Sequence, residues 1–355
     1  MAYTTIDDPS AHFQTMLWTG DDADDRALTN DGNSDLKPDL VWIKERNSTS
    51  AHQLIDSTRG GGLALSSHDD LAEESFAYID TFDTDGFTLE TSDGSTNQDG
   101  NTFVAWQWKA NGGTTSSVSA SGTTLASTHQ TDSTSKFCIM TWTGSGTAGH
   151  KVTHGLGSVP KLIIVKKRSG TDSWAVYQHK NTSAPETDYL HLDETIATAD
   201  SVDRWNDTAP TSTLITLGDA GVGNADSGTY VGYCWDEVQG YSKFGSYTGN
   251  GNADGPFIYT GFKPAWIIQK NAADSTNWNI HDNKRSTSNT VDDILMANAT
   301  DAEGAVGGKS IDFLSNGFKL RGNDNETNDN GDVHIYMAFA EQPFVTSGGV
   351  PCTAR

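Results

Sequence analysis

Short runs of alternating hydrophobic and polar residues recur along the chain, separated about every ten residues by clusters of Gly, Asn, Asp and Ser. In such runs, alternate side chains fall on one face of a β-strand. Asp85-Gly86 and Asn316-Gly317 each precede an apolar run. This dipeptide is a strong signal for a tight turn between antiparallel strands. The pattern predicts an all-β protein built from antiparallel β-sandwiches.

Helical patterns are scarce. The best candidates are the acidic segments 69–76 and 290–297, which each have room for about two turns. Their carboxylates lie near the start of the segment, where the helix dipole favours negative charge. We therefore expect at most two short helices, at matching places in the first and last thirds of the chain.

One strand-like phrase occurs three times, each time as a mainly apolar run between a proline and a lysine six positions later. The three runs are Pro38–Lys44, Pro160–Lys166 and Pro264–Lys270. Each run is preceded by an aromatic residue with Thr-Gly and followed by a closing strand, and these closing strands are 103–108, 230–235 and 334–339. We predict three tandem sandwiches of about 100 residues, of jelly-roll or lectin-like type.

These landmarks predict the domain limits. The sandwiches are expected at residues 1–110, 136–240 and 241–345, with a Gly/Ser/Thr-rich linker or long loop at 111–135 and a C-terminal tail at 346–355. Each unit is longer than the about 20–50 residues of a solenoid repeat, so each is expected to bury its own core. Tandem units of this kind predict an extended rod.

Charge and composition exclude several functions. The 355 residues include 23 Lys and Arg against 47 Asp and Glu, which gives a formal net charge of −24. Such a field repels phosphate, so we expect no nucleic-acid partner. No apolar stretch approaches the ~18 residues of a membrane-spanning helix, so we expect no membrane insertion. Of the three cysteines, Cys138 and Cys234 lie in apolar runs, as buried reduced thiols do.

Aromatic residues close to loops are candidates for stacking on the apolar face of a sugar ring. They are Trp18, Trp142, Tyr247, Trp174, Trp205 and Trp278. Core and hairpin packing is the alternative, and we favour it, because aromatic cross-strand pairs also stabilise hairpins.

The lysines that end the three repeated runs occupy one offset. Lys44, Lys166 and Lys270 are therefore candidates for lining a shared groove or pairing across an interface. The favoured interpretation is a solvent-exposed lysine that guards a strand end, which is a common use of this residue.

Adjacent carboxylates such as Glu73-Glu74, Asp236-Glu237 and Asp292-Asp293 suggest a glycosidase. Hydrolysis requires two carboxyl groups on either side of a sugar, whereas neighbours on a strand point to opposite faces. We therefore expect no enzymatic activity.

Three turns rich in Asp and Asn offer oxygen ligands for calcium. They are residues 21–25, 80–85 and 323–332. None follows the EF-hand order, and these residues also occupy turns for backbone reasons. We expect no cofactor, with Ca²⁺ as the alternative.

Several phrases resemble a family of repeat-containing, uncharacterised structural proteins of tailed phages of marine bacteria, including cyanophages. The phrases are Ser10–Thr15, Phe103–Gly112, Tyr241–Gly251, Phe313–Leu320, Tyr336–Phe344 and Gly349–Arg355. The resemblance implies a non-enzymatic protein of the virion surface, made in the host bacterial cytoplasm. Some relatives look like large proteins with a lectin-like domain, which implies adhesion.

From this resemblance we expect a homotrimer in a tail fibre, spike or appendage. Its partners would be other virion proteins and a host cell-surface glycan or receptor. The first unit would attach to the particle, and the second and third would face outward. The alternatives are a capsid decoration or knob protein that stabilises the head, and a carbohydrate-active depolymerase.

Overall fold

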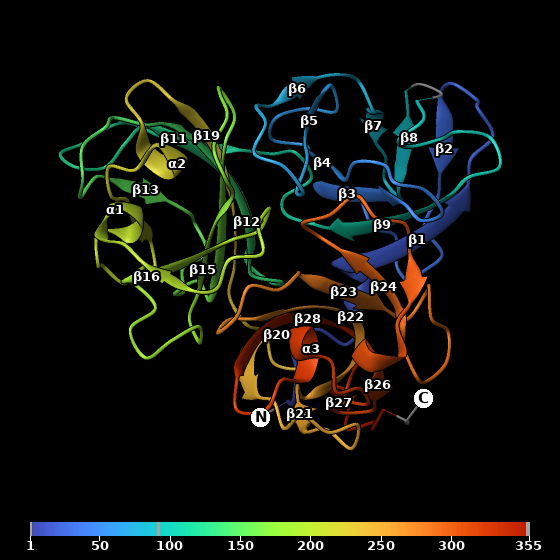
Figure 1. Ribbon diagram of the computed structural model, residues 1–355. Helices are drawn as coiled ribbons and strands as arrows, with labels where there is room; N and C mark the ends of the chain where they lie inside the picture. Colours follow the sequence, from blue (N-terminus) through green and yellow to red (C-terminus); the bar gives the residue numbers. More distant parts are fainter. Residues whose placement is uncertain (1, 91–92, 353–355) are drawn as a thin grey trace.

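The computed structural model describes residues 2–90 and 93–352, and most of its regular elements are β-strands. Figure 1 shows three lobes around a common centre. We name them lobe 1 (residues 13–108), lobe 2 (116–235) and lobe 3 (242–343). The predicted all-β sandwich fold is confirmed. The expected extended rod is wrong, because the three lobes pack against one another around one apolar centre.

Lobe 1 packs a six-stranded antiparallel sheet against a three-stranded one. The large sheet has the order β1 (Phe13–Thr19), β9 (Thr102–Trp108), β3 (Leu40–Glu45), β4 (Gln53–Asp56), β5 (Leu63–Leu65) and β6 (Glu74–Ser75). The small sheet has the order β2 (Arg26–Leu28), β8 (Phe87–Leu89) and β7 (Ile79–Phe82). A 3₁₀ turn, η1 (Pro9–Ala11), precedes β1.

Lobe 2 has the same strand order in its large sheet, with two added strands at one edge, and its small sheet has two strands instead of three. Its large sheet has the order β10 (Ser116–Val118), β11 (Ser127–Asp132), β12 (Phe137–Thr143), β19 (Thr229–Trp235), β14 (Leu162–Lys167), β15 (Ala175–Gln178), β16 (Asp188–His191) and β17 (Ala199–Asp200). The other elements are β13 (Lys151–Thr153), which pairs with β18 (Leu214–Thr216), and the single-turn helices α1 (Val202–Trp205) and α2 (Gly221–Asn224).

The tract 111–135, predicted as a linker or long loop, supplies these added strands. β11 pairs with β12 over six residues, from Ser127 opposite Trp142 to Asp132 opposite Phe137. Ladder hydrogen bonds and two buried residues, Ser127 and Gln130, hold this polar segment in the sheet. From residue 116 on, the tract is therefore a part of lobe 2.

Lobe 3 repeats the strand order of lobe 1. Its large sheet has the order β20 (Ser242–Thr248), β28 (Val333–Pro343), β22 (Phe262–Asn271), β23 (Asn279–Asp282), β24 (Asp293–Met296) and β25 (Gly304–Ala305). Its small sheet has the order β21 (Phe257–Tyr259), β27 (Gly317–Leu320) and β26 (Ile311–Leu314), accompanied by η2 (Gly307–Lys309) and α3 (Asn325–Asn328).

Both expected helices are wrong. Segment 69–76 contains the short strand β6, and segment 290–297 contains β24. β24 pairs with β23, which buries Leu295 in the core shared by the lobes. Burial of apolar side chains in a sheet outweighs a weak local helix preference.

The central strand β3 shows how the lobes share a core. Leu40 and Trp42 point into an apolar cluster that contains residues of all three lobes, whereas Val41 and Ile43 point into the smaller cluster between the two sheets of lobe 1. Both faces of the strand are therefore buried. Each lobe has an apolar cluster of its own, and one face of every large sheet also packs against the other lobes.

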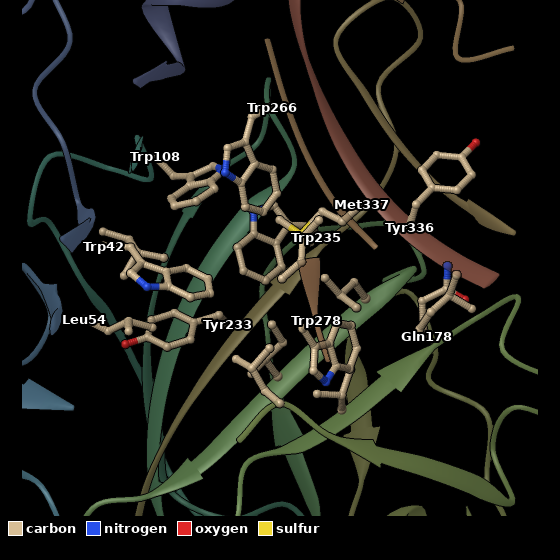
Figure 2. A pocket seen from close by; sticks show the side chains of 17 residues that line it. Trp42, Leu54, Trp108, Gln178, Tyr233, Trp235, Trp266, Trp278, Tyr336 and Met337 are labelled. Carbon is tan, nitrogen blue, oxygen red and sulfur yellow. The ribbon is translucent and has the colours of Figure 1, made fainter. Parts of the chain in front are cut away.

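A small cavity of about 30 Å³ remains at the centre of this shared core. Figure 2 shows the rings around it, which come from all three lobes: Trp42 and Trp108, Tyr233 and Trp235, and Trp266 and Trp278. The space exceeds the ~10–15 Å³ needed for one water, but its lining is apolar and contains no charged side chain. We attribute it to imperfect packing of three curved sheets.

The N-terminal segment crosses from lobe 1 to lobe 3. The Tyr3 hydroxyl donates to the carbonyl of Gly261 at 2.8 Å, and Ile6 is buried in the shared core. Figure 1 shows the described residues nearest to both chain ends beside lobe 3. The start of the chain therefore packs on lobe 3, although its first strand belongs to lobe 1.

Candidate functional site

Three of the six predicted sugar-stacking rings already stack on a ring of the adjacent strand. Trp18 lies over Phe103, its partner in the strand register, with ring centroids 5.3 Å apart and planes 15° apart. The equivalent stacked pairs are Trp142 with Tyr230 and Tyr247 with His334. These rings are buried, so their faces are not available to a sugar. These three rings therefore form cross-strand aromatic pairs, which is the alternative favoured from the sequence.

The other three predicted rings are also buried. Trp174 and Trp278 lie between lobes, and their indole N–H groups donate to the carbonyls of Ser66 and His191 at 2.9 and 2.8 Å. Trp205 packs against Tyr177 inside lobe 2. A stacking platform needs an exposed face, so these rings stabilise the fold and are not candidates for a sugar site.

The three repeated lysines are fully buried, so the favoured interpretation as solvent-exposed guards is wrong. Each ammonium donates to backbone carbonyls, including those of Glu45, Asp172 and Asn271. Lys166 also donates across a lobe boundary to the carbonyl of Asp70 at 2.9 Å. Burial lowers the pKa of each of these amines to about 8.

A chain of alternating charges joins lobe 1 to lobe 2. Arg59 donates to Asp56 at 2.5 Å and to Glu73 at 2.9 Å. Glu73 also receives two hydrogen bonds of 2.8 Å from Arg168 of lobe 2. The Tyr233 hydroxyl of lobe 2 donates to Asp56 at 2.8 Å. Although burial acts in the opposite direction, the two arginines lower the pKa of Glu73. We call this contact the 1–2 seam.

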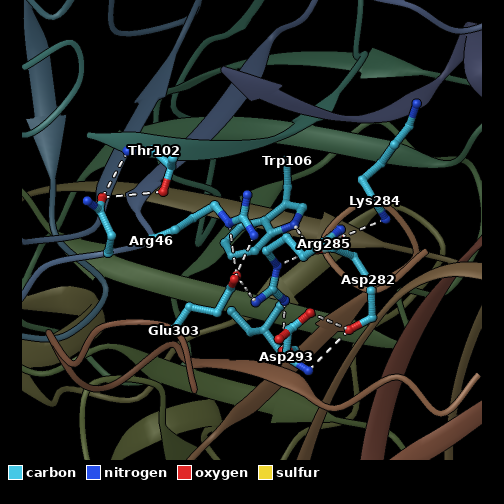
Figure 3. A network of polar contacts seen from close by, with 11 residues as sticks. Arg46, Thr102, Trp106, Asp282, Lys284, Arg285, Asp293 and Glu303 are labelled. Atoms are coloured by element: carbon cyan, nitrogen blue, oxygen red, sulfur yellow. Dashed lines mark hydrogen bonds and ion pairs between the residues drawn. The ribbon is translucent and has the colours of Figure 1, made fainter. Parts of the chain in front are cut away.

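The same network joins lobe 3 to lobe 1, and Figure 3 shows it. Arg285 donates to Asp282 at 2.5 Å and to Glu303 at 3.0 Å, and Arg46 of lobe 1 donates to Glu303 at 2.6 Å. The Trp106 indole N–H donates to Asp282 at 3.0 Å, in the place of the tyrosine hydroxyl. We call this contact the 1–3 seam. Both networks bridge lobes, so their charges serve assembly of the fold.

The 2–3 seam has no counterpart of this network among the described residues. Eighteen and twenty-one positions after the repeated proline, Gln178 and Asn181 replace the aspartate and the arginine. The backbone bond from Thr198 to Ala272 corresponds to those from Glu73 to Arg168 and from Glu303 to Arg46. This seam is joined by neutral hydrogen bonds and apolar contacts.

An exposed aromatic pair distinguishes lobe 3. The buried residues Leu28, Val152 and Ile258 of the outer strands lie opposite Phe87, Ile215 and Phe318 in the strand register. Around Ile258 lie Phe257 and Tyr259, which are 46% and 53% exposed. At the same positions lobe 1 has Ala27 and Thr29, and lobe 2 has Lys151 and Thr153. The buried residue of this strand is apolar in all three lobes, whereas the exposed rings occur in one.

A surface hollow of about 420 Å³ lies beside Tyr259. It is lined by Tyr3, Glu237, Gln239, Ser242, Lys243, Tyr259 and Thr260. The hydroxyls of Tyr3 and Tyr259 are 3.0 Å apart, so two phenol side chains meet at one rim. The volume lies in the range of about 300–1,000 Å³ typical of small-molecule sites.

The charged groups of the hollow are paired with each other. Lys243 donates to one oxygen of Glu237 at 2.8 Å, and the other oxygen accepts the backbone N–H of Phe244 at 3.1 Å. Burial raises the pKa of Tyr3 to about 12, so this phenol keeps its proton at neutral pH. The hollow therefore has an exposed aromatic ring beside hydrogen-bonding groups. The charges of Glu237 and Lys243 cancel each other.

A second group of titratable side chains lies at the end of β16 and in the turn that follows it. His191, Asp193 and Glu194 have potential ligand atoms within 4.8 Å of one another, and among the described residues this is the one such group of three. Burial raises the pKa of Asp193 to about 7. Burial opposes ionisation of Glu194 as well, but hydrogen bonds from Ser173 and His191 lower its pKa. The group lies outside the three turns considered for calcium.

Asp193 has a structural role that its counterpart repeats. It accepts the backbone N–H of Trp174 at 2.8 Å, and Asn298 accepts the backbone N–H of Trp278 at 2.9 Å at the equivalent place in lobe 3. Because an uncharged amide serves the same purpose, this position does not require an ionisable group.

The fold and surface thus define an all-β protein of three sandwich lobes with a shared core and a ring-lined hollow on one lobe. A family described as a domain of unknown function, DUF7483, matches residues 8–343, and the chain belongs to this family. No significant match to the chain exists among curated proteins or among solved structures. Within the described residues, no helix has the length and apolarity to cross a membrane.

Sequence reasoning missed Tyr3 and Tyr259, although a signal for Tyr259 exists. Aligning the three copies on Leu28, Val152 and Ile258 would have shown two extra rings in the third copy. Tyr3 carries no such signal, because it reaches the hollow only through the crossing of the N-terminal segment to lobe 3.

Proposed function

We propose that this protein is a non-enzymatic structural protein of a phage virion surface that binds a host cell-surface glycan through the hollow beside Tyr259. The carrying observation is the exposed ring of Tyr259, which borders a hollow with polar walls and stands where lobes 1 and 2 have Thr29 and Thr153. An exposed ring next to hydrogen-bonding groups is the chemistry that sugar recognition uses. The phage origin rests on the resemblance described above.

A glycan array probed with the full-length protein tests the binding. We expect wild-type protein to retain sugars and Tyr259→Ala to lose them. Phe257→Ala is the matched control, because Phe257 lies two residues away on the same strand, is similarly exposed and does not line the hollow. Equal retention by wild-type protein and Tyr259→Ala would contradict the proposal.

The position on the particle separates an appendage from a capsid decoration or knob. Antibody labelling of purified virions is expected to place the protein on the tail fibre or spike. Labelling of the capsid faces would favour the decoration protein, which stabilises the head without recognising a host.

The depolymerase alternative has one supporting observation, the carboxyl pair Asp193 and Glu194 with pKa values shifted in opposite directions. Such a pair is what a glycosidase uses as acid and base. A reducing-sugar assay with Asp193→Asn tests it, and the variant should fold because Asn298 holds the equivalent place in lobe 3. Sugar release that disappears in this variant would favour the depolymerase, and we expect no release from either protein.

A further inference from the structure

The hollow beside Tyr259 also has features that select among sugars, and this inference rests on the proposed function. Its lining contains one carboxylate, Glu237, and one ammonium, Lys243, which bond to each other at 2.8 Å. The remaining lining side chains are neutral hydroxyl, phenol and amide groups. The hollow therefore offers no unpaired charge to a ligand.

A negatively charged sugar would meet two obstacles here. A carboxylate or sulfate on the sugar would have to compete with Glu237 for the only ammonium in the lining. If it displaced Glu237, it would leave a carboxylate without its cation in a protein of net charge −24. Both side chains are partly exposed, 23% for Glu237 and 38% for Lys243, so this penalty is moderate and adds to the repulsion by the negative field of the protein.

A positively charged amino sugar would meet a like charge. Glu237 is the only carboxylate in the lining, and Lys243 is bonded to it at 2.8 Å. An ammonium on the ligand that approached Glu237 would therefore lie close to the ammonium of Lys243, which repels it.

An uncharged pyranose matches the groups that remain. Its apolar face would pack on the exposed ring of Tyr259, which is 53% exposed. Two adjacent hydroxyls of the sugar would bridge the Glu237–Lys243 pair, donating to the carboxylate and accepting from an ammonium N–H that does not point at Glu237. The Gln239 amide lies in the same lining and supplies both a donor and an acceptor.

We infer that the hollow selects a neutral hexopyranose over acidic and basic sugars, with Tyr259 as the stacking ring and Glu237 and Lys243 as the groups that read adjacent hydroxyls. Selection arises because the hollow presents charges only as a closed pair.

Saturation-transfer NMR with the full-length protein tests this inference. The probes are methyl glucoside, methyl mannoside and methyl galactoside, each with the uronate, the 2-amino sugar and the 6-sulfate of the same ring stereochemistry as charged counterparts. We expect at least one neutral methyl glycoside to bind, and the charged sugar of the same ring stereochemistry to bind about tenfold more weakly or not at all.

Two variants assign the effect to the named groups. Tyr259→Ala is expected to reduce binding of the neutral glycoside about tenfold, whereas Phe257→Ala leaves it unchanged. Glu237→Gln removes the carboxylate partner of Lys243, so the variant should bind glucuronate more tightly than the wild type does. This binding should still depend on the ring of Tyr259. Circular dichroism of each variant verifies the β-fold.

The outcomes separate this inference from the proposed function. If an acidic or a basic sugar binds as tightly as its neutral counterpart or more tightly, and Tyr259→Ala removes that binding, the charge argument is overturned and glycan binding stands. If no probe and no array sugar binds in a way that depends on Tyr259, both are overturned.

Discussion

The 1–2 and 1–3 seams are joined by charged side chains and the 2–3 seam by neutral ones, although equivalent strands of the lobes form all three. The first two bury a chain of Asp, Arg, Glu and Arg, whose central aspartate and arginine side chains are fully buried. The third has Gln178, Asn181, Thr198 and Ala272 at the equivalent places. Buried charges are thus not required for two lobes of this fold to pack, because neutral groups fill the same positions at one seam.

What the charged seams add is sensitivity to the loss of one partner. A buried ion network contributes little net stability relative to an apolar replacement, but removing one member leaves an uncompensated charge. The two charged seams should therefore be intolerant of single substitutions, and the neutral seam should be tolerant.

The largest expected effect comes from removing the central arginine of a charged seam, and it tests the difference between charged and neutral seams directly. Arg59→Leu leaves Asp56 and Glu73 without their shared cation and should lower the free energy of unfolding by about 3–5 kcal/mol. Asn181→Leu, at the equivalent place in the 2–3 seam, removes one neutral acceptor for Thr198 and should cost about 1 kcal/mol. Urea unfolding followed by tryptophan fluorescence measures both, and equal losses would contradict the comparison.

Acid should act on lobe 3 through His334, which stands where lobes 1 and 2 have Phe103 and Tyr230. Burial lowers the pKa of His334 from 6.5 to about 4. The unfolded chain binds this proton more readily, so the contribution to stability is complete above pH 6.5 and is lost as the pH falls toward 4, by up to about 3 kcal/mol.

The variant His334→Phe sharpens this test, because phenylalanine stacks under Trp18 at the same position of lobe 1. The fall in unfolding free energy between pH 7 and pH 4 should be smaller in the variant than in the wild type. Parallel pH profiles would show that His334 does not titrate with unfolding.

A smaller effect is expected when two buried tryptophans are compared, one that hydrogen-bonds across a seam and one that does not. The Trp174 indole N–H bridges the 1–2 seam to Ser66, whereas the indole N–H of Trp235 has no hydrogen-bond partner among the described residues. Trp174→Phe should cost about 1–2 kcal/mol more than Trp235→Phe, because only the first leaves a carbonyl without its donor. Thermal unfolding of the two variants measures the difference, and identical costs would exclude a role for this hydrogen bond.

The smallest expected effect comes from a double variant that introduces part of the missing ion network into the 2–3 seam. Thr198→Glu with Ala272→Arg places the outer ion pair of the other seams on the 2–3 seam. In the two charged seams, the outer arginines Arg46 and Arg168 are partly exposed, by 21% and 22% of their side chains. The coupling between the two substitutions should be about 0.5–1 kcal/mol at low salt and weaker in 1 M NaCl. A double-mutant cycle with both single variants gives this value, and zero coupling would show that the seam geometry differs.

The strands and their faces were predictable from the chain alone. Period-two alternation indicated which residues share a face, and Asn316-Gly317 marked a turn that the structure places between β26 and β27. Local preference failed where polar tracts join a sheet, as in β11, and where acidic segments resemble helix starts, as in β24. Pairing with a neighbouring strand decides those segments, and a single strand carries little information about its neighbour.

The candidate site was less predictable than the fold. Trp174 and Lys166 were correctly recognised as repeated positions, but their alternation does not reveal that a second lobe covers that face and buries them. Tyr259 is exposed because its lobe presents that side outward, and Tyr3 reaches it from the opposite end of the chain.

By itself the sequence determined the all-β class, the alternating faces and the recurring phrases, because these depend on neighbours within a few residues. Only the tertiary structure decided that the lobes close around one core, that the repeated rings and lysines are buried, and that a hollow forms beside Tyr259. The physical reason is that burial depends on what packs against a face, and these partners lie about a hundred residues or more away in the chain.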